Sequence, residues 1–277
     1  MTVPEFPNAF HWFADRPRSR WGRRHVVPRA LLSAFVLLGL GLVGEAGGAG
    51  ASTPSAPPAS IGVTEHRTVP AAITDLAFQD QDGRTVTLDQ FRGKVVLLAP
   101  FLTSCQEECP ITTGALLEMA KSIARDGLAH QVALIEVTVD PGRDTPARLA
   151  AYARWTGSDW PLLTGTGATI AQLWRYFGVY YQTVPEGSPP GIDWETHQPY
   201  TYDVDHSDGF FLLDQRLRER FFAGGMVKVG KLPPRLQHLL DREGRSNLKD
   251  PGGGHWTVAQ GLDAIGWVLG RQLPDRQ

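Results

Sequence analysis

The two cysteines of this 277-residue chain lie close together, as Cys105 and Cys109 in the segment CQEECP (105–110). With three residues between them, both sulfurs can bind one metal ion, or they can close into a disulfide. A disulfide between such near neighbours restrains the unfolded chain little, so stabilisation is a poor reason for it. The spacing therefore indicates metal binding or redox chemistry. A plain structural disulfide and two unrelated buried cysteines are the alternatives.

A helix is expected directly after this segment. Pro110 suits the first helical position, which places Cys109 at the N-cap and Cys105 in the preceding loop. Amide groups and the dipole at a helix N-terminus lower a thiol pKa, which favours Cys109 as the thiolate. Glu107 and Glu108 are interpreted as solvated loop charges.

Among eight histidines, His206 is the candidate third ligand, because it comes just before the apolar segment FFLLD (210–214). A histidine at a strand start is more often a surface residue. In a thioredoxin-type topology, however, this junction faces the cysteine loop. Asp205 is expected to orient the imidazole from the second shell. His197, in a Pro-rich segment, is the reserve ligand.

Two soft thiolates and one imidazole suit copper, above all Cu(I). Zinc normally takes four protein ligands, or three and a water at a catalytic site. The motif contains no evident general base for catalytic zinc. Copper is therefore the metal that the donor set favours.

Buried strands and helices are expected around the cysteine segment. The runs VVLLAPF (95–101) and VALIEVTV (132–139) are almost continuously apolar, as in strands that are buried on both faces. A helix from Pro110 to about Asp126 follows the first run, and 182–204 reads as a long Pro-rich loop. Further elements are expected as a hairpin at Asp82-Gly83, a helix between Thr145 and Gly157, a short strand within 160–163, a helix over 170–177 that stops at Gly178, a hairpin of 210–214 and 218–224, and a helix from about Thr257 to Leu269.

Two parallel βα units followed by a hairpin and a helix predict an α/β sandwich with helices on both sheet faces. Ligand sites in such sheets lie at the carboxyl ends of the strands. Residues 104–110 follow the 95–101 strand and fall at this edge.

The first 51 residues have the features of an export segment. Residues 1–29, a basic cytoplasmic n-region, contain six arginines against Glu5 and Asp15. Residues 30–51 read as a signal peptide core or a membrane anchor, with an A-x-A site that ends at Ala51. The alternative, a buried core helix, lacks an amphipathic pattern.

Both readings of the export segment place the bulk of the chain outside the cytoplasm. The apolar run 30–43 is short for a membrane span, which needs about 20 residues. The protein is thus either anchored or released by cleavage near Ala51. Residues 52–68 are expected to be a flexible Ala/Pro/Ser linker, and 69–275 the folded domain.

Composition excludes some classes of protein. Two cysteines cannot form a disulfide-stapled mini-fold or a four-cysteine zinc module. The formal net charge of −2 lacks the basic excess of a nucleic-acid binder.

With these motifs, residues 70–225 resemble the SCO/SenC family of copper-binding, thioredoxin-like proteins. The matching segments are KVVLLAPF (94–101) with the C-x-x-x-C-P motif, VDP (139–141) with DTP (144–146), LTG (163–165) with FGVYY (177–181), and DHS (205–207). Family loops often have a proline where this chain has Gln106. The segment after Gly225 matches poorly, and the sequence assigns it no role.

The resemblance implies a thioredoxin-like sandwich, with a central mixed sheet flanked by helices. It implies that Cys105, Cys109 and His206 bind copper, as Cu(I) or Cu(II). It also implies a partner, the copper-site subunit of cytochrome c oxidase. A thiol reductant or another copper carrier is a further expected partner.

Three functions remain open from the sequence. The first is a copper metallochaperone, which is not an enzyme. The second is a thiol–disulfide oxidoreductase in which Cys105 attacks and Cys109 resolves, reducing the cysteines of the copper-site partner. The third is a copper or redox sensor that signals to a partner.

Overall fold

The computed structural model describes residues 54–273, which belong to one compact unit, Ala49–Gln277. The basic n-region and the signal or anchor segment lie outside the described residues, so their predictions stay predictions. Within the described part of the chain, no helix has the length and apolar character needed to cross a bilayer.

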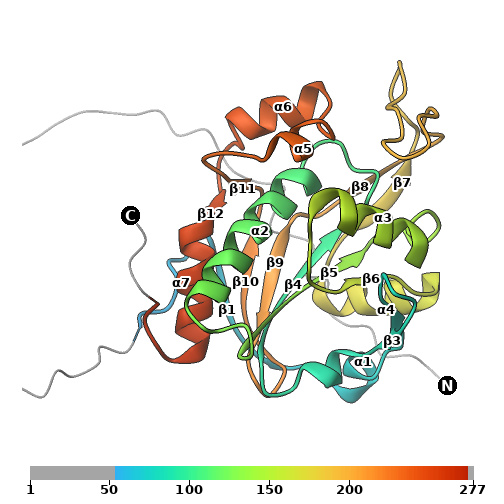
Figure 1. The fold of residues 1–277 in the computed structure, drawn as a ribbon. Coiled ribbons are helices and arrows are strands. Elements are labelled where there is room, and N and C mark those ends of the chain that lie inside the picture. The colour runs from blue at the N-terminus through green and yellow to red at the C-terminus, as the bar shows by residue number, and fades with distance from the viewer. Residues whose placement is uncertain (1–53, 274–277) are drawn as a thin grey trace, which may run out of the picture. The chain divides into compact units, whose positions relative to one another are not determined.

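A six-stranded mixed sheet forms the centre of the domain, in the order β1-β10-β9-β4-β5-β6 (Figure 1). One half is parallel and consists of β4 (Val95–Phe101), β5 (Val132–Thr138) and β6 (Leu162–Leu163). The other half is antiparallel and consists of β9 (Gly209–Leu213), β10 (Arg218–Gly224) and β1 (Gly62–Thr68). Every residue of β4 is buried, as its apolar run predicted.

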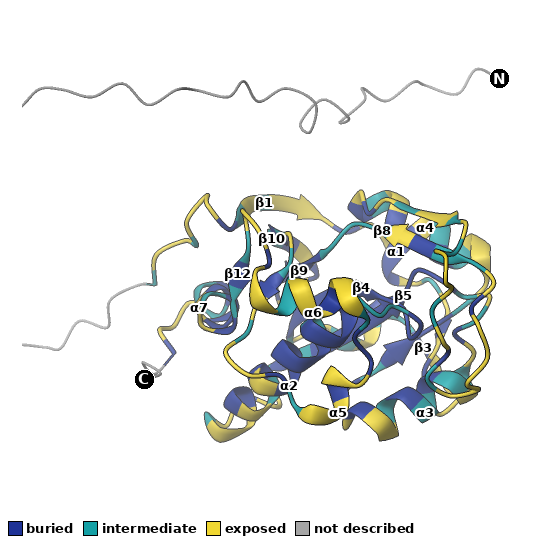
Figure 2. Cartoon of the chain, turned by 90° about the horizontal axis from the view of Figure 1, so that it is seen from above, coloured by how far each residue is buried: buried dark blue, intermediate teal, exposed yellow. Residues whose placement is uncertain are grey.

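Helices cover both faces of the sheet, which confirms the predicted α/β sandwich (Figures 1 and 2). One face carries α2 (Cys109–Arg125), α3 (Pro146–Thr156) and α7 (Val258–Leu269), and the other carries α1 (Ala71–Thr74) and α4 (Gly167–Phe177). Side chains of a β-strand alternate from one face of the sheet to the other. Both faces therefore carry side chains that the helix layers cover.

Neighbouring residues of β9 show this alternation. The Phe210 ring contacts Trp256, beside α7, with centroids 4.7 Å apart. The Phe211 ring contacts Phe177 of α4 on the opposite face, with centroids 4.8 Å apart. Both layers are therefore anchored on one central strand.

Local capping explains where the helices begin and end. The Thr145 side chain accepts a hydrogen bond from the Arg148 amide, and Gly157 ends α3 with φ of 75°, so both predicted boundaries are confirmed. The helix predicted over 170–177 begins earlier, at Gly167, because Thr166 is its N-cap.

The linker prediction for 52–68 is wrong at its C-terminal end, where β1 pairs with β10. This edge strand is mostly exposed and polar, so it lacks the apolar run that marks β4. Main-chain pairing holds it, together with an ion pair of 2.5 Å between Arg67 and Glu219.

The predicted 182–204 loop is shorter than expected, because both of its ends are strands. β7 (Tyr181–Val184) pairs with β8 (Asp203–His206), and Tyr181 lies opposite His206. The hairpin fixes the base of the loop next to the candidate ligand.

The remaining elements are short, and several belong to the segment after Gly225. They are β2 (Phe78–Gln79), β3 (Thr85–Val86), the 3-10 helix η1 (Leu88–Phe91), β11 (Val227–Lys228), α5 (Pro234–Gln237), α6 (Arg242–Lys249) and β12 (Trp256–Thr257). β2 and β3 form the hairpin predicted at Asp82-Gly83.

Candidate metal centre

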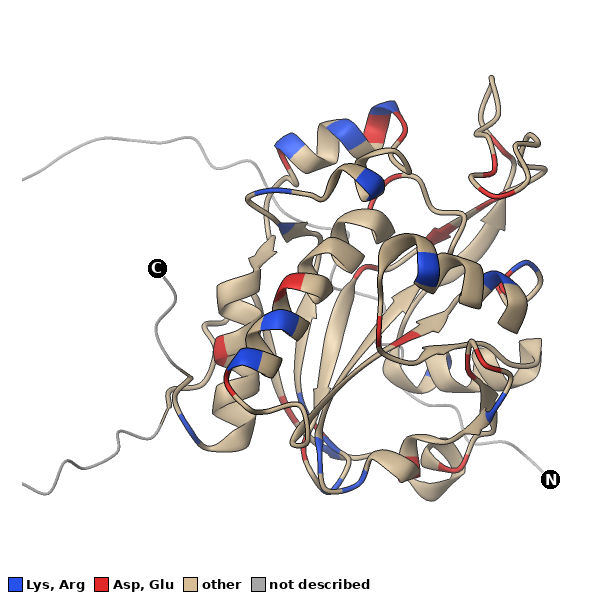
Figure 3. Ribbon diagram, in the orientation of Figure 1, with Lys and Arg blue, Asp and Glu red and all other residues tan. Residues whose placement is uncertain are grey.

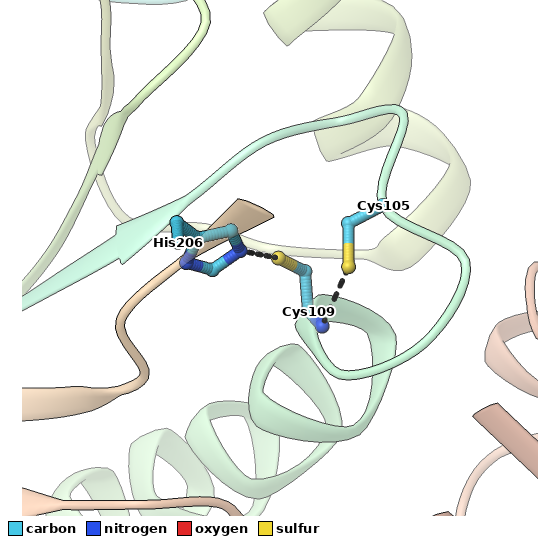
Figure 4. Close-up of side chains that lie close together, drawn as sticks. All are labelled: Cys105, Cys109 and His206. Carbon is cyan, nitrogen blue, oxygen red and sulfur yellow. Dashed lines mark hydrogen bonds between the residues drawn. The ribbon is translucent and has the colours of Figure 1, made fainter. Parts of the chain in front are cut away.

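The structure brings Cys105, Cys109 and His206 together at the carboxyl end of β4. One ligand atom from each residue lies within 4.8 Å of the others, and no second group of this kind occurs among residues 54–273. Figure 4 shows both sulfurs and the imidazole pointing toward one another. Ninety-seven positions separate Cys109 from His206 in the chain, so only the fold creates this arrangement.

The cysteine segment turns directly from β4 into α2. Cys109 is the first residue of α2 and Glu108 is its N-cap, so the prediction of Cys109 as N-cap is wrong by one position. Pro110 then occupies the second helical position, where its missing amide also costs nothing, because the first-turn amides lack helical acceptors. Cys109 is thereby buried, whereas Cys105 is half-buried.

Helix amides converge on the sulfur of Cys105. Its Sγ accepts hydrogen bonds from the Glu108 amide at 3.5 Å and from the Cys109 amide at 3.4 Å. A hydrogen bond from the Cys109 thiol lowers the pKa of Cys105 well below its ordinary value, against the effect of burial, and His206 lowers it further. Burial and the hydrogen bond to Cys105 raise the pKa of Cys109. The predicted assignment of the thiolate to Cys109 is therefore wrong.

Strand β8 ends at His206, and the backbone after it fixes the ring. Nδ1 lies 3.0 Å from the Ser207 carbonyl oxygen, to which it donates, and Nε2 lies 3.6 Å from the Cys109 sulfur. This tautomer leaves Nε2 free to bind a metal.

The predicted second-shell role of Asp205 is not supported. Asp205 is exposed and pairs with Gln182 across the hairpin. Asp208 lies near the ring instead, with its Oδ1 3.8 Å from His206 Nδ1. In a β-strand, adjacent side chains point to opposite faces, which directs the Asp205 carboxylate away from the His206 ring.

Negative charge around the ring favours its protonated form. Burial opposes protonation, but the hydrogen bond to Cys105 and the charge of Asp208 raise the pKa of His206 to about 9. A metal ion bound at Nε2 would therefore displace a proton.

The interpretation of Glu107 and Glu108 as solvated charges is wrong, because both are half-buried beside the sulfurs. Burial and the charge of Cys105 raise the pKa of Glu107 to about 7. Burial and a hydrogen bond with Asp208 raise the pKa of Glu108 to about 10. The sequence does not reveal this crowding, because β8 and its following turn bring Asp208 from elsewhere in the chain.

His197, the reserve ligand, lies away from the sulfurs. It is exposed in the 185–202 loop, at φ of 59°, and is not part of the Cys–Cys–His group.

A buried polar network that the sequence does not assign to the site lies behind the cysteine segment. The Asp144 carboxylate accepts hydrogen bonds from Thr103, two residues before Cys105, and from Thr138 at the end of β5. Burial raises the pKa of Asp144 to about 6. Asp144 thus fixes the strand ends from which the cysteine segment starts, and its DTP motif was the available signal.

Gln106 joins the cysteine segment to two other parts of the chain. Its side-chain amide donates to the Ile192 carbonyl in the 185–202 loop at 3.1 Å, and its main-chain carbonyl accepts from the Asp241 amide at 3.0 Å. A Cβ at Gly244 of α6 would come within 2.3 Å of this carbonyl. The C-terminal segment, to which the sequence assigns no role, therefore packs against the segment between the two cysteines.

Fold and site together define a thioredoxin-like protein with a two-cysteine, one-histidine centre. The family model described as SCO1/SenC matches residues 65–225, which contain all three side chains. The chain belongs to the SCO1/SenC family. Helices α5 and α6 lie beyond the matched residues.

The chain is similar to several known proteins. "Protein SCO2 homolog, mitochondrial" of Bos taurus is 32% identical over 139 residues, which cover 50% of this chain and 48% of the bovine protein. The match thus spans about half the length of this curated relative. Arabidopsis thaliana ScoI with copper bound is 26% identical, with a TM-score of 0.46, over 54% of this chain and 85% of that one. A protein of Aquifex aeolicus VF5 shares the fold at a TM-score of 0.51 and 17% identity, over 75% of this chain and 96% of that one.

Proposed function

We propose that this protein is an extracytoplasmic copper chaperone that binds Cu(I) through Cys105, Cys109 and His206. It delivers the ion to the copper centre of cytochrome c oxidase. The observation that carries the proposal is the convergence of the three donor atoms within 4.8 Å. Two thiolates and an imidazole form a soft donor set that suits Cu(I).

The burial of the site supports transfer of the ion. Cys109 and His206 hold the ion from the protein side, and half-buried Cys105 lines a cleft that opens to solvent. A partner thiolate can enter there and form a copper–sulfur bond as the bond to Cys105 breaks. Copper keeps its valence during this exchange, and the protons released on binding return to the cysteines and histidine.

The N-terminal sequence pattern is what supports the proposed compartment. A basic block precedes a short apolar run and an A-x-A site. The domain therefore acts outside the cytoplasm, anchored by this segment or released after cleavage near Ala51.

Metal titration tests the copper site. The reduced protein is expected to bind one Cu(I), measured against a competing chelator, and Cys105→Ser or Cys109→Ser is expected to abolish tight binding. Retention of one-to-one tight binding in either variant would contradict the proposed ligand set. Circular dichroism of each variant separates loss of a ligand from loss of the fold.

The arrangement also favours a second function, reduction of a disulfide in the copper-site partner. Both cysteines are free, and the helix amides stabilise a thiolate at Cys105, the more accessible sulfur. Cys105 would attack a partner sulfur and release its other thiolate. Cys109 would then attack Cys105 and release the second, so that the partner gains the two electrons that this pair loses.

A further inference from the structure

A large cleft lies over the cysteine segment, and three parts of the chain build it. Its volume is about 1110 Å³, and Cys105 and His206 are among its lining residues. The walls are the cysteine segment (104–108), the 185–202 loop with strand β8, and the start of α6 (241–243). We call this feature the acidic cleft.

Charge in the acidic cleft is strongly one-sided. Eight of its lining residues carry carboxyl groups, of which Glu108 is protonated at neutral pH because its pKa is about 10. Arg242 and His206 are the lining residues that can carry a positive charge. Within the described part of the chain, none of these carboxylates forms an ion pair with a lysine or arginine. Figure 3 shows acidic positions on β8, in the adjoining loop and on α6. Apart from Asp208, which lies beside His206, the carboxyl groups of the cleft therefore have no cationic side chain as an ion-pair partner.

A single metal ion does not fit this distribution of carboxylates. Among residues 54–273, the Cys–Cys–His group is the only one whose donor atoms lie close enough to hold an ion. The carboxylates are spread over three walls instead, as Glu107 on one, Glu186 on the next and Glu243 on the third. Separate positive charges along one ligand match this spacing.

Hydrogen-bonding capacity in the cleft also remains unused. Ser104, which lines the cleft, is 5% exposed, and its hydroxyl has no hydrogen-bond partner. A buried hydroxyl without a partner is costly, and a polar group of a ligand would satisfy it. A peptide main chain supplies such donors and acceptors at every residue.

We propose that the acidic cleft binds a basic, extended segment of the protein that exchanges copper with this chain. Its lysine or arginine side chains lie against the walls, which places the partner's thiols over Cys105. This inference rests on the proposed function only in naming copper as the ion that the partner exchanges. Because Asp241 and Glu243 lie beyond the family match, the third wall makes the cleft particular to chains with this C-terminal segment.

Peptide binding to the full-length protein tests the proposal. The probe is a fluorescent, cysteine-free peptide of alternating Lys and Gly, and a peptide of alternating Glu and Gly is the control. Fluorescence anisotropy is expected to show binding of the Lys peptide only, with an affinity that falls as salt screens the charges. Absence of binding at low salt, or equal binding of the Glu peptide, would overturn the proposal.

Two carboxylates on opposite walls locate the binding site. Glu186→Gln with Glu243→Gln keeps side-chain size and is expected to weaken Lys-peptide binding by about fivefold, a modest effect for one half-buried and one exposed charge. The matched control, Glu118→Gln with Asp159→Asn, removes two exposed carboxylates that do not line the cleft and is expected to leave binding unchanged. Equal affinities of the two double variants would overturn the location.

Cu(I) titration of the same samples separates this inference from the proposed function. Both double variants are expected to keep wild-type Cu(I) affinity, because neither changes a ligand. Wild-type protein that binds copper but not the Lys peptide would overturn the cleft alone. Protein that binds the Lys peptide but no Cu(I) would overturn the copper function and leave the cleft standing as a basic-peptide site.

Discussion

At the residue scale, the three donor side chains differ in what they contribute. The Ser207 carbonyl fixes the His206 ring, and its Nε2 lies beside Cys109. Cys105 instead receives two main-chain hydrogen bonds from the start of α2. His206 is therefore expected to determine the affinity for the metal ion, and the helix amides the reactivity of the Cys105 sulfur.

His206→Ala separates the two candidate functions. Removal of one of three ligands is expected to weaken Cu(I) binding by more than about 100-fold, since loss of an outer-shell partner alone costs about 10–100-fold. Disulfide reduction by Cys105 and Cys109 should stay close to wild type. Chelator competition and a disulfide-reduction assay measure the two effects, and wild-type copper affinity in this variant would eliminate the three-ligand model.

The two sulfurs are expected to react in a defined order. Iodoacetamide should modify Cys105 of the reduced, copper-free protein before Cys109, because Cys105 is half-buried and carries the stabilised thiolate, whereas Cys109 is 3% exposed. Peptide mass spectrometry over a time course identifies the labelled residue. Faster labelling of Cys109 would show that the helix amides do not select the thiolate.

At the element scale, contact between α6 and the cysteine segment depends on one glycine. Gly244→Ala would place a Cβ 2.3 Å from the Gln106 carbonyl oxygen, so α6 must shift. We expect a loss of about 1–3 kcal/mol in unfolding free energy, as for overpacked sites, and faster Cu(I) release. Urea denaturation and stopped-flow transfer to a chelator measure these two effects.

Gly253→Ala is the matched control for this glycine, because nothing lies within 4 Å of a Cβ at Gly253. It is expected to change neither quantity. If Gly244→Ala behaved in the same way as Gly253→Ala, close packing of α6 on the cysteine segment would be refuted.

Elements that bury apolar side chains were predictable from the sequence, whereas elements held by main-chain pairing were not. The run of β4 and the Thr145 and Gly157 boundaries of α3 match their predictions, because these residues determine structure locally. The sequence predicts a linker where strand β1 forms, since the exposed polar residues of β1 gain their structure from pairing with β10. Strands β7 and β8 are likewise not predicted, because main-chain pairing between them holds them in place.

Site residues divide along the same line. Cys105, Cys109 and His206 were predicted, because their residue types carry the chemistry. Asp208 was not, since its position depends on the turn after β8, and the role of α6 depends on packing against Gln106. The position of Asp208 beside the cysteine segment and the packing of α6 both depend on contacts between segments that are far apart in the chain.

At the scale of the whole molecule, one buried carboxyl group links stability to pH. Glu136 in β5 is fully buried and accepts a hydrogen bond from the Trp160 indole at 2.8 Å. Burial raises the pKa of Glu136 from 4.5 to about 7. The folded protein therefore binds this proton more tightly than the unfolded chain, so its stabilising effect is present below pH 4.5 and is lost as pH rises through 7.

Glu136→Gln is expected to remove this pH dependence. The variant should gain stability relative to wild type between pH 5 and pH 8, by up to about 3 kcal/mol, because Gln stays neutral. Urea unfolding at the two pH values measures the change, with exposed Glu118→Gln as the control. A difference between variant and wild type that does not vary with pH would contradict a raised pKa at Glu136.

The Asp241 amide donates a hydrogen bond to the Gln106 carbonyl, so the exchange rate of this amide proton depends on the conformation of the cysteine segment. This amide can exchange with deuterium only when the cysteine segment and the C-terminal segment separate. An ion bound by Cys105 and Cys109 would restrain the backbone between them, so exchange at Asp241 would be expected to slow. We therefore expect hydrogen exchange at the Asp241 amide to differ between the copper-loaded and copper-free protein, although the C-terminal segment contributes no ligand.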